Sequence, residues 1–279
     1  MTIMPAFAVS FLETAFFMDC MQTALTDDER ERYHRNMLLE GFGLTGQKRL
    51  RAARVLVIGL GGLGSPALFY LAAAGVGKIG VVDGDRVELS NLQRQILHGD
   101  PDVGKAKTMS ACETIGRSYP RIQLASHDYR LMAANVAETL AAYDFVIEAT
   151  DNFESKFLVN DACVRSGKPF SHAAVSGYFG QTMTVVPGKG PCYRCVFGEV
   201  PPGGAVKGPD EEGTLGPVAG VMGTIQATEA IKYLVGAGEL LVGRLLTWDA
   251  WAQSFREVLL PPQPSCPECR SGAPPQPAA

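Results

Sequence analysis

The stretch from Val55 to Arg94 constrains the fold of this chain more than any other part of its 279 residues. An apolar, β-branched run at 55–58 enters a glycine-rich turn, and a mostly apolar segment of helical character leaves it. A strand, turn and helix in this order present backbone N–H groups at a helix N-terminus, where phosphate oxygens can bind. The pattern therefore predicts a nucleotide site whose turn contains Gly59, Gly61, Gly62 and Gly64.

Two features after the glycine turn extend this prediction. Asp83 closes the next apolar run, about 20 residues further on, where a carboxylate commonly accepts from ribose hydroxyls. Asp83 could instead only cap the end of a strand. The polar segment 90–94, Ser-Asn-Leu-Gln-Arg, is not needed by a bare dinucleotide-binding fold, and it directs Arg94 toward the same crevice.

Strand-like and helix-like segments alternate through the first two thirds of the chain. Such alternation gives right-handed crossovers and parallel strands, so we predict an α/β fold with a Rossmann-like, doubly wound sheet. The expected strands are 55–58, 79–82, 122–125, 145–149 and 170–174. The expected helices are 65–74, 105–117, 133–142 and 154–166.

The pattern changes after Val175. Short strands at 180–187, 244–248 and 255–260 look antiparallel, so the sheet is expected to be mixed, and 220–234 is expected to be a buried helix. The segment 200–216 is too rich in Gly and Pro for a regular element. It is also long for a surface loop, and such loops are usually functional or disordered.

Composition and charge exclude several classes of protein. The net charge is −4 and no basic cluster breaks the balance, which argues against nucleic acid as the partner. No apolar run approaches the roughly 20 residues of a membrane span. The apolar N-terminus lacks Lys and Arg and contains Glu13 and Asp19, unlike a secretory signal. We expect a cytoplasmic protein with an N-terminal extension (1–24), one domain (25–270) and a disordered tail (271–279).

Four of the seven cysteines form two C-x-x-C pairs. Two such pairs about 70 residues apart suit a tetrahedral Zn²⁺ site that clips a distant segment to the domain. Because protein would supply all four ligands, we predict a structural role for the metal. A redox motif is the alternative, although it needs only one pair. The predicted ligands are Cys192, Cys195, Cys266 and Cys269.

With these motifs in view, the chain resembles the MoeB/ThiF (HesA) family, the bacterial branch of the ubiquitin-activating-enzyme superfamily. The resemblance spans about residues 25–269, nearly the whole chain. A glycine fingerprint alone would be weak evidence, but eight motifs in family order are specific. They are R32-Y-H-R35, G59-L-G-G-L-G-S-P66, D83-G-D85, S90-N-L-Q-R94, G104-K-A-K107, T150-D-N152, P191-C-Y-R-C195 and C266-P-E-C269.

The resemblance implies ATP-dependent adenylation of the C-terminal glycine of a ubiquitin-like sulfur-carrier protein of the MoaD or ThiS type, ending in Gly-Gly. The products would be an acyl-adenylate and pyrophosphate. A separate sulfur donor, a rhodanese or a cysteine desulfurase, would then supply sulfur for a thiocarboxylate, as in molybdopterin or thiamine biosynthesis. Because two anions must approach each other, this reaction needs charge neutralisation more than acid–base chemistry.

The resemblance also implies roles for particular residues. Arg94 and Lys107 would contact phosphates, and Asp151 would be associated with catalytic Mg²⁺. Arg35 would reach across a homodimer into the nucleotide site of the partner. The expected nucleotide-binding set is Gly59, Gly61, Gly62, Gly64, Asp83, Ser90, Asn91, Arg94, Lys107, Asp151 and Asn152.

Simpler interpretations of these residues stay open. Lys107 could be a solvated lysine on an exposed helix face, and Arg35 an ordinary surface residue. Asp151 could cap a helix, with or without a functional role. Lys156 could reach phosphate or lie exposed on its helix.

One departure from the family concerns the long loop. Many relatives have a cysteine there, in a segment like C-x-E-x-G-x-x-G-P, whereas residues 209–217 read Pro-Asp-Glu-Glu-Gly-Thr-Leu-Gly-Pro. We therefore predict adenylation without a covalent thioester. Other functions also stay open: an NAD-dependent oxidoreductase, a tRNA-base dehydratase of the same superfamily, and a non-enzymatic scaffold for a ubiquitin-like partner.

Overall fold

A computed structural model describes residues 25–202, 212–261, 263 and 265–271. The predicted N-terminal extension lies outside this range, as do residues 203–211 of the predicted irregular loop. Of the predicted tail, only Ser271 is described, and it ends helix α12 (Pro267–Ser271).

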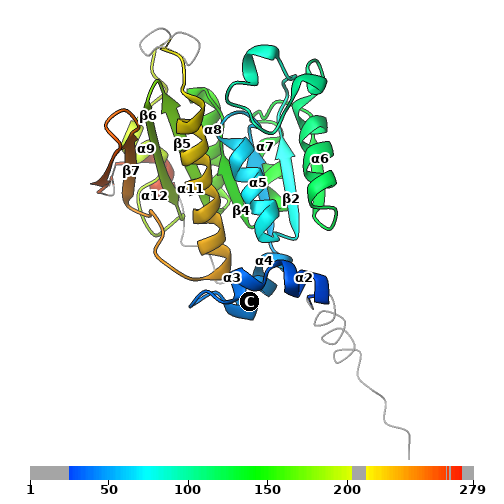
Figure 1. Cartoon of the computed structure of the whole chain (residues 1–279). Coiled ribbons are helices and arrows are strands. Elements are labelled where there is room, and N and C mark those ends of the chain that lie inside the picture. The colour runs from blue at the N-terminus through cyan, green and yellow to red at the C-terminus, as the bar shows by residue number, and fades with distance from the viewer. Residues whose placement is uncertain (1–24, 203–211, 262, 264, 272–279) are drawn as a thin grey trace, which may run out of the picture.

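A mixed, eight-stranded sheet forms the centre of the described structure, in the order β3-β2-β1-β4-β5-β6-β7-β8 (Figure 1). Neighbours from β3 through β5 pair in parallel, and neighbours from β5 through β8 pair antiparallel. The predicted fold class, a Rossmann-like sheet that is parallel first and antiparallel later, is confirmed. The strands are β1 (Arg54–Ile58), β2 (Lys78–Val82), β3 (Gln123–His127), β4 (Phe145–Glu148), β5 (Phe170–Ser176), β6 (Phe179–Val185), β7 (Arg244–Asp249) and β8 (Ser254–Leu259).

Helices cover both faces of this sheet, which explains why the residues of β1 are apolar without alternation. Val55 and Val57 pack into one core with α5 (Gly64–Ala74) and α11 (Gly216–Val235). Leu56 and Ile58 pack into a second core with α7 (Val136–Ala141) and α8 (Phe153–Arg165). Figure 1 shows α5 and α11 side by side across the near face. The other helices are α2 (Asp27–Arg32), α3 (His34–Met37), α4 (Gly43–Ala52), α6 (Lys107–Ser118) and α9 (Tyr193–Phe197), with 3₁₀ turns η1 (Leu89–Asn91) and η2 (Asp100–Asp102).

Helix boundaries differ from the predictions where backbone or cap geometry intervenes. Helix α6 begins two residues later than expected because Ala106 is extended and pairs with Arg86. Helix α11 begins four residues earlier than expected, with Pro217 in its first turn, a favoured position for proline. The short helices α2 to α4 were not expected, although Thr26 and Glu29 form a capping box that starts α2.

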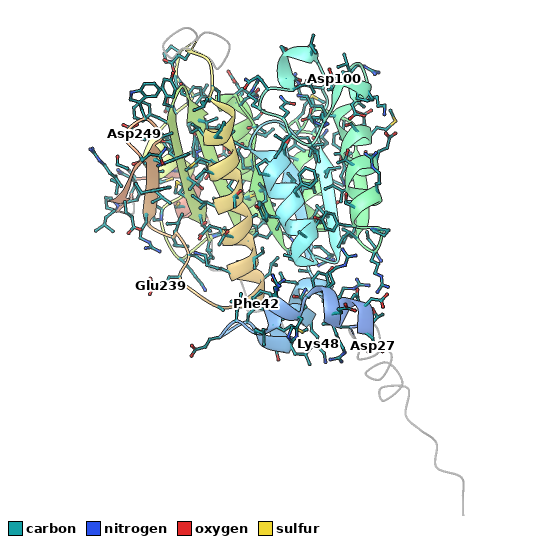
Figure 2. All side chains as sticks on the ribbon, viewed as in Figure 1. Asp27, Phe42, Lys48, Asp100, Glu239 and Asp249 are labelled. Carbon is teal, nitrogen blue, oxygen red and sulfur yellow. The ribbon has the colours of Figure 1, made fainter. Side chains whose placement is uncertain are left out.

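Helices α2, α3 and α4 lie together at the edge of the sheet where the parallel strands begin, since β1 directly follows α4 (Figure 1). Figure 2 shows Asp27 and Lys48 at this end of the molecule and Asp100 and Asp249 at the opposite end. In the part of the chain with described structure, no helix has both the length and the apolar character needed to cross a membrane.

Candidate active site

A cavity of about 820 Å³ opens at the carboxyl ends of the parallel strands. The segments that follow β1, β2 and β4 line it, together with the end of β5. The chain leaves β1 toward β2 on one side, whereas β4 pairs with the other side of β1. Ligands of doubly wound sheets bind at such a switch point. The predicted nucleotide crevice therefore coincides with the cavity.

The four glycines of the turn after β1 have different structural roles. Gly59 has a φ of +90°, which favours glycine. A Cβ at Gly64 would lie 1.9 Å from the carbonyl oxygen of Gly59, so Gly64 permits close backbone packing. A Cβ at Gly61 would meet only the Gln95 amide, at 3.6 Å. Gly59, Gly61 and Gly62 line the cavity, and Gly64 does not.

Asp83 both holds the glycine turn and lines the cavity. Its Oδ2 accepts from the backbone N–H of Leu60 at 2.8 Å, and its Oδ1 accepts from that of Asp85 at 2.9 Å. Burial raises the pKa of Asp83, while the charge of Lys107 and these two N–H groups act in the opposite direction. Asp83 therefore caps the end of its strand and also faces the cavity, so the two interpretations are compatible. Its contact with a ribose stays a prediction.

Lys107 is buried, with 7% of its surface exposed, so the interpretation as a solvated lysine is wrong. Its Nζ lies 3.3 Å from Oδ2 of Asp85. Arg130, which the sequence analysis did not single out, lies 3.5 Å from the other oxygen of the same carboxylate. Both cations line the cavity. Asp85 therefore pairs with two cations that an anionic ligand could also bind.

Arg94 contributes a third cation to the cavity wall. Its Nη1 donates to the carbonyl oxygen of Ser90 at 3.1 Å, and among the described residues it forms no ion pair. Ser90 and Asn91 lie outside the cavity lining. Asn91 Oδ1 accepts from the backbone of Glu88 at 3.3 Å and helps to shape η1. The nucleotide contacts of Ser90 and Asn91 stay predictions.

Asp151 and Asn152 lie in the loop between β4 and α8 and line the cavity. Asn152, rather than Asp151, is the N-cap of α8, because its Oδ1 accepts from the N–H of Ser155 at 2.9 Å. The Asp151 carboxylate is exposed, and its Oδ1 accepts from the Asn152 amide at 3.4 Å. A carboxylate at the edge of a cavity lined by cations is a ligand that Mg²⁺ accepts.

Lys156 is buried, so the interpretation as an exposed helix lysine is wrong. Its Nζ lies 3.1 Å from Glu148 and donates to the carbonyl oxygens of Thr150 at 2.6 Å and Ala173 at 2.8 Å. These acceptors come from β4, the loop after it and β5. Lys156 therefore anchors the loop that carries Asp151, and its ammonium is already satisfied by the protein.

Glu148 is the centre of this buried cluster. Its carboxylate accepts from His172 Nδ1 at 2.6 Å and from the backbone N–H of Thr150 at 2.8 Å. Burial alone would raise its pKa, but Lys156, His172 and Thr150 outweigh burial and lower the pKa to about 2. Burial lowers the pKa of His172. Sequence analysis missed Glu148 and His172, although an ionisable residue in a buried strand was a usable signal.

The other half of the cavity is mostly uncharged. It is formed by the ends of β5, β6 and β7 and by α9, and Tyr193 and Phe197 of α9 take part. The small residue Gly180 also lies there. This half suits a neutral, extended ligand rather than phosphate.

Arg35 lies on α3, at the opposite edge of the sheet from the cavity entrance, and is exposed. No ion pair or hydrogen bond within the described residues involves its side chain. Its position fits a surface arginine and equally an arginine that serves another subunit, so its role stays a prediction.

The four predicted cysteine ligands lie together, with all four sulfur atoms within 4.8 Å of one another. Cys192 Sγ lies 3.9 Å from Cys195 and 3.7 Å from Cys266, and Cys195 Sγ lies 3.6 Å from Cys269. A tetrahedral site with metal–sulfur bonds of about 2.3 Å needs sulfur atoms about 3.8 Å apart. The cluster can therefore hold a metal ion.

The ThiF family matches the chain over residues 33–268. The chain belongs to the ThiF family. A sulfur carrier protein adenylyltransferase of Thermus thermophilus is 45% identical over 249 residues, which cover 88% of this chain and 92% of that protein. The SAMP-activating enzyme E1 of Haloferax volcanii is 44% identical, over 90% of this chain and 93% of that protein. The prediction of an adenylyltransferase is confirmed at the level of enzyme class.

Two further comparisons concern a longer relative and a solved structure of lower sequence identity. The probable adenylyltransferase/sulfurtransferase MoeZ of Mycobacterium tuberculosis is 44% identical over 88% of this chain, which spans only 64% of MoeZ. Escherichia coli MccB superposes with a TM-score of 0.77 at 23% identity, over 92% of this chain and 81% of MccB. At that identity the MccB match shows the fold alone.

Proposed function

We propose that this enzyme adenylates the C-terminal glycine of a ubiquitin-like sulfur-carrier protein, using ATP. The observation that carries the proposal is the division of one cavity into two halves. Arg94, Lys107 and Arg130 line the half beside the glycine turn, and the half formed by β5, β6, β7 and α9 is mostly uncharged. A triphosphate suits the first half, and a peptide tail of small residues suits the second.

In the proposed reaction, a carboxylate oxygen of the terminal glycine attacks the α-phosphorus of ATP. The new bond gives the acyl-adenylate, and the α–β bridging bond breaks to release pyrophosphate. Arg94 and Lys107 offset the repulsion between the carboxylate and the phosphates and stabilise the charge that develops at the transferred phosphorus. Asp151 would hold Mg²⁺, which would supply positive charge to offset the charge of the phosphates.

The globular part of the carrier would rest on an apolar surface beside the cavity mouth, here called the β8 surface. It consists of apolar residues around the start of β6 and the turn from β7 to β8, namely Tyr178, Phe179, Trp251 and Phe255, which are 43% to 77% exposed. Phe179 belongs to both this surface and the cavity lining, so a carrier seated here has its tail at the entrance. Exposed apolar patches of this kind commonly mark protein partners.

Several finer points belong to the same proposal. The four-cysteine cluster would hold structural Zn²⁺, and Arg35 would complete the partner's site in a homodimer. The enzyme would act in the cytoplasm with a separate sulfur donor. Because no cysteine occupies residues 209–217, no thioester would form on this loop. A carrier adduct that dithiothreitol releases on a non-reducing gel would contradict this last point.

The test is carrier-dependent exchange of labelled pyrophosphate into ATP, run with a panel of carriers that end in Gly-Gly. Arg94→Ala should lower the exchange rate by about 100-fold or more, as the loss of a charge-stabilising group does elsewhere. Arg117→Ala, an exposed arginine of α6 outside the cavity, is the matched control and should retain wild-type exchange. Absence of exchange with every carrier, or full exchange by Arg94→Ala, would refute the proposal. Binding of NADH in place of ATP would favour the oxidoreductase.

A further inference from the structure

His98 is a buried histidine that contacts two elements of the cavity wall and follows a third in the chain. It is 7% exposed and lies four residues after Arg94. Its Nε2 lies 3.1 Å from the carbonyl oxygen of Leu60, and its Nδ1 lies 2.8 Å from Oγ of Ser110. Leu60 belongs to the glycine turn, and Ser110 lies on α6, whose first residue is Lys107.

These contacts determine how His98 must be protonated. A backbone carbonyl can only accept, so Nε2 carries the hydrogen and donates to Leu60. In the neutral ring Nδ1 is then an acceptor, and the Ser110 hydroxyl, which also contacts the Asp102 carboxylate, is the donor available to it. Burial lowers the pKa of His98, which agrees with a neutral ring. The imidazole therefore bridges a carbonyl and a hydroxyl in one defined orientation.

The bond to Leu60 matters because both backbone polar groups of this residue are hydrogen-bonded to side chains. The N–H of Leu60 donates to Asp83, and its carbonyl oxygen accepts from His98. The peptide group that contains this carbonyl also contains the N–H of Gly61, which lines the cavity. A fixed carbonyl direction thus fixes the direction of an N–H in the turn predicted to bind phosphate.

We propose that His98 is a positioning residue, which holds the glycine turn, the Arg94 segment and helix α6 in one arrangement for binding the phosphates of ATP. The inference rests on the proposed function. His98 touches no substrate and acts through Leu60, Arg94 and Lys107. Loss of its donor should let the turn and the two cations move independently, so that ATP binds more weakly and reacts more slowly.

The experiment compares His98→Leu with His98→Gln, whose Nε2 amide can still donate to the Leu60 carbonyl. Magnesium-ATP affinity is measured by calorimetry, and KM and kcat are measured by carrier-dependent exchange. We expect His98→Leu to raise the Kd and KM for ATP by about tenfold and to lower kcat, in line with a lost buried hydrogen bond. His98→Gln should return these values to within about threefold of wild type.

Thr184→Val is the matched control. It removes a buried hydrogen bond of 2.6 Å to Glu229, away from the cavity lining. It should lower the melting temperature without changing ATP binding. If His98→Leu does not fold, Ser110→Ala removes the Nδ1 contact, together with the Ser110 contact to Asp102, and should still weaken ATP binding. ATP affinity at the wild-type value in whichever of these two variants folds would overturn the proposal. Wild-type ATP binding without exchange would refute only the proposed function, because the binding constants still test His98.

Discussion

Glu148, Lys156 and His172 form a buried ionic cluster beside the cavity, and its charges are close to balanced. Lys156 and Glu148 are both at most 5% exposed. Buried ion pairs add little stability relative to apolar residues of the same shape, because removing two charges from water is costly. The ion pair here serves to position the backbone. Lys156 joins Glu148 to the carbonyl oxygens of Thr150 and Ala173, and so it orients the loop that bears Asp151.

Lys156→Met should destabilise the protein by about 3–5 kcal/mol, because it leaves the Glu148 carboxylate buried without its cation. Urea unfolding monitored by circular dichroism measures the loss. The double variant Lys156→Met with Glu148→Gln removes the stranded charge and should recover part of the stability. A single variant within about 1 kcal/mol of wild type would contradict the interpretation of this cluster.

At the scale of elements, strand β8 forms one edge of the described sheet, opposite the β3 edge, and most of its residues are exposed. Phe255 stacks on Trp248 of β7, with ring centroids 5.5 Å apart, and Tyr178 packs on Trp251 at 4.6 Å. Exposed edge strands need protection from unwanted pairing. A carrier that covers the β8 surface would provide it.

Phe255→Glu should raise the KM for the carrier by about tenfold or more, because apolar anchors near the centre of an interface dominate its binding energy. The Kd for magnesium-ATP should not change, since Phe255 lies outside the cavity lining. Met109→Glu, at an exposed position of α6 that is 48% accessible, is the control and should leave both constants unchanged. An unchanged carrier KM in Phe255→Glu would place the docking surface elsewhere.

At the scale of the whole molecule, the cysteine cluster joins segments that are far apart in the chain. Helix α9 begins next to Cys192, α12 carries Cys269, and Tyr193 and Phe197 of α9 line the cavity. The ion pair of Arg165 with Glu268, at 2.6 Å, also attaches α12 to α8. The cysteine cluster therefore supports one wall of the cavity as well as the C-terminal segment.

Removal of the metal should destabilise the whole domain. Cys269→Ser, or a strong chelator, should abolish a metal content of about one zinc per chain and lower the melting temperature by about 10 °C or more. Metal analysis and thermal unfolding measure the two effects. Cys112→Ser, a change in a cysteine outside the cluster, should alter neither. Full stability after complete loss of metal would argue against a structural role.

Stability should also fall as the pH is lowered from 7 to 5. Burial lowers the pKa of His98, His127 and His172, so the unfolded chain takes up protons first, near pH 6.5. The stability from the neutral rings is present above that pH and is lost below it. Glu148, whose folded pKa is about 2, adds a further loss only below about pH 4.5. Urea midpoints at pH 7, 6 and 5 test this, and a midpoint that rises on acidification would contradict it.

The sequence alone was sufficient for features that depend on neighbours in the chain. Strand and helix periodicity predicted the parallel half of the sheet and its antiparallel continuation, because burial on both faces requires continuous apolar runs. The spacing of the glycines predicted the turn. The two C-x-x-C pairs predicted that the four cysteines cluster, since two such pairs at this spacing are typical of a tetrahedral metal site.

Tertiary structure alone decided which polar residues are buried and what each of them contacts. The exposure of Lys107 and Lys156 depends on Asp85 and Glu148, which lie 22 and 8 positions away. Likewise, His98 meets Leu60 across 38 positions. No periodicity encodes such pairs, because the cost of burying a charge or an imidazole is set by partners that only the folded chain brings within hydrogen-bonding distance.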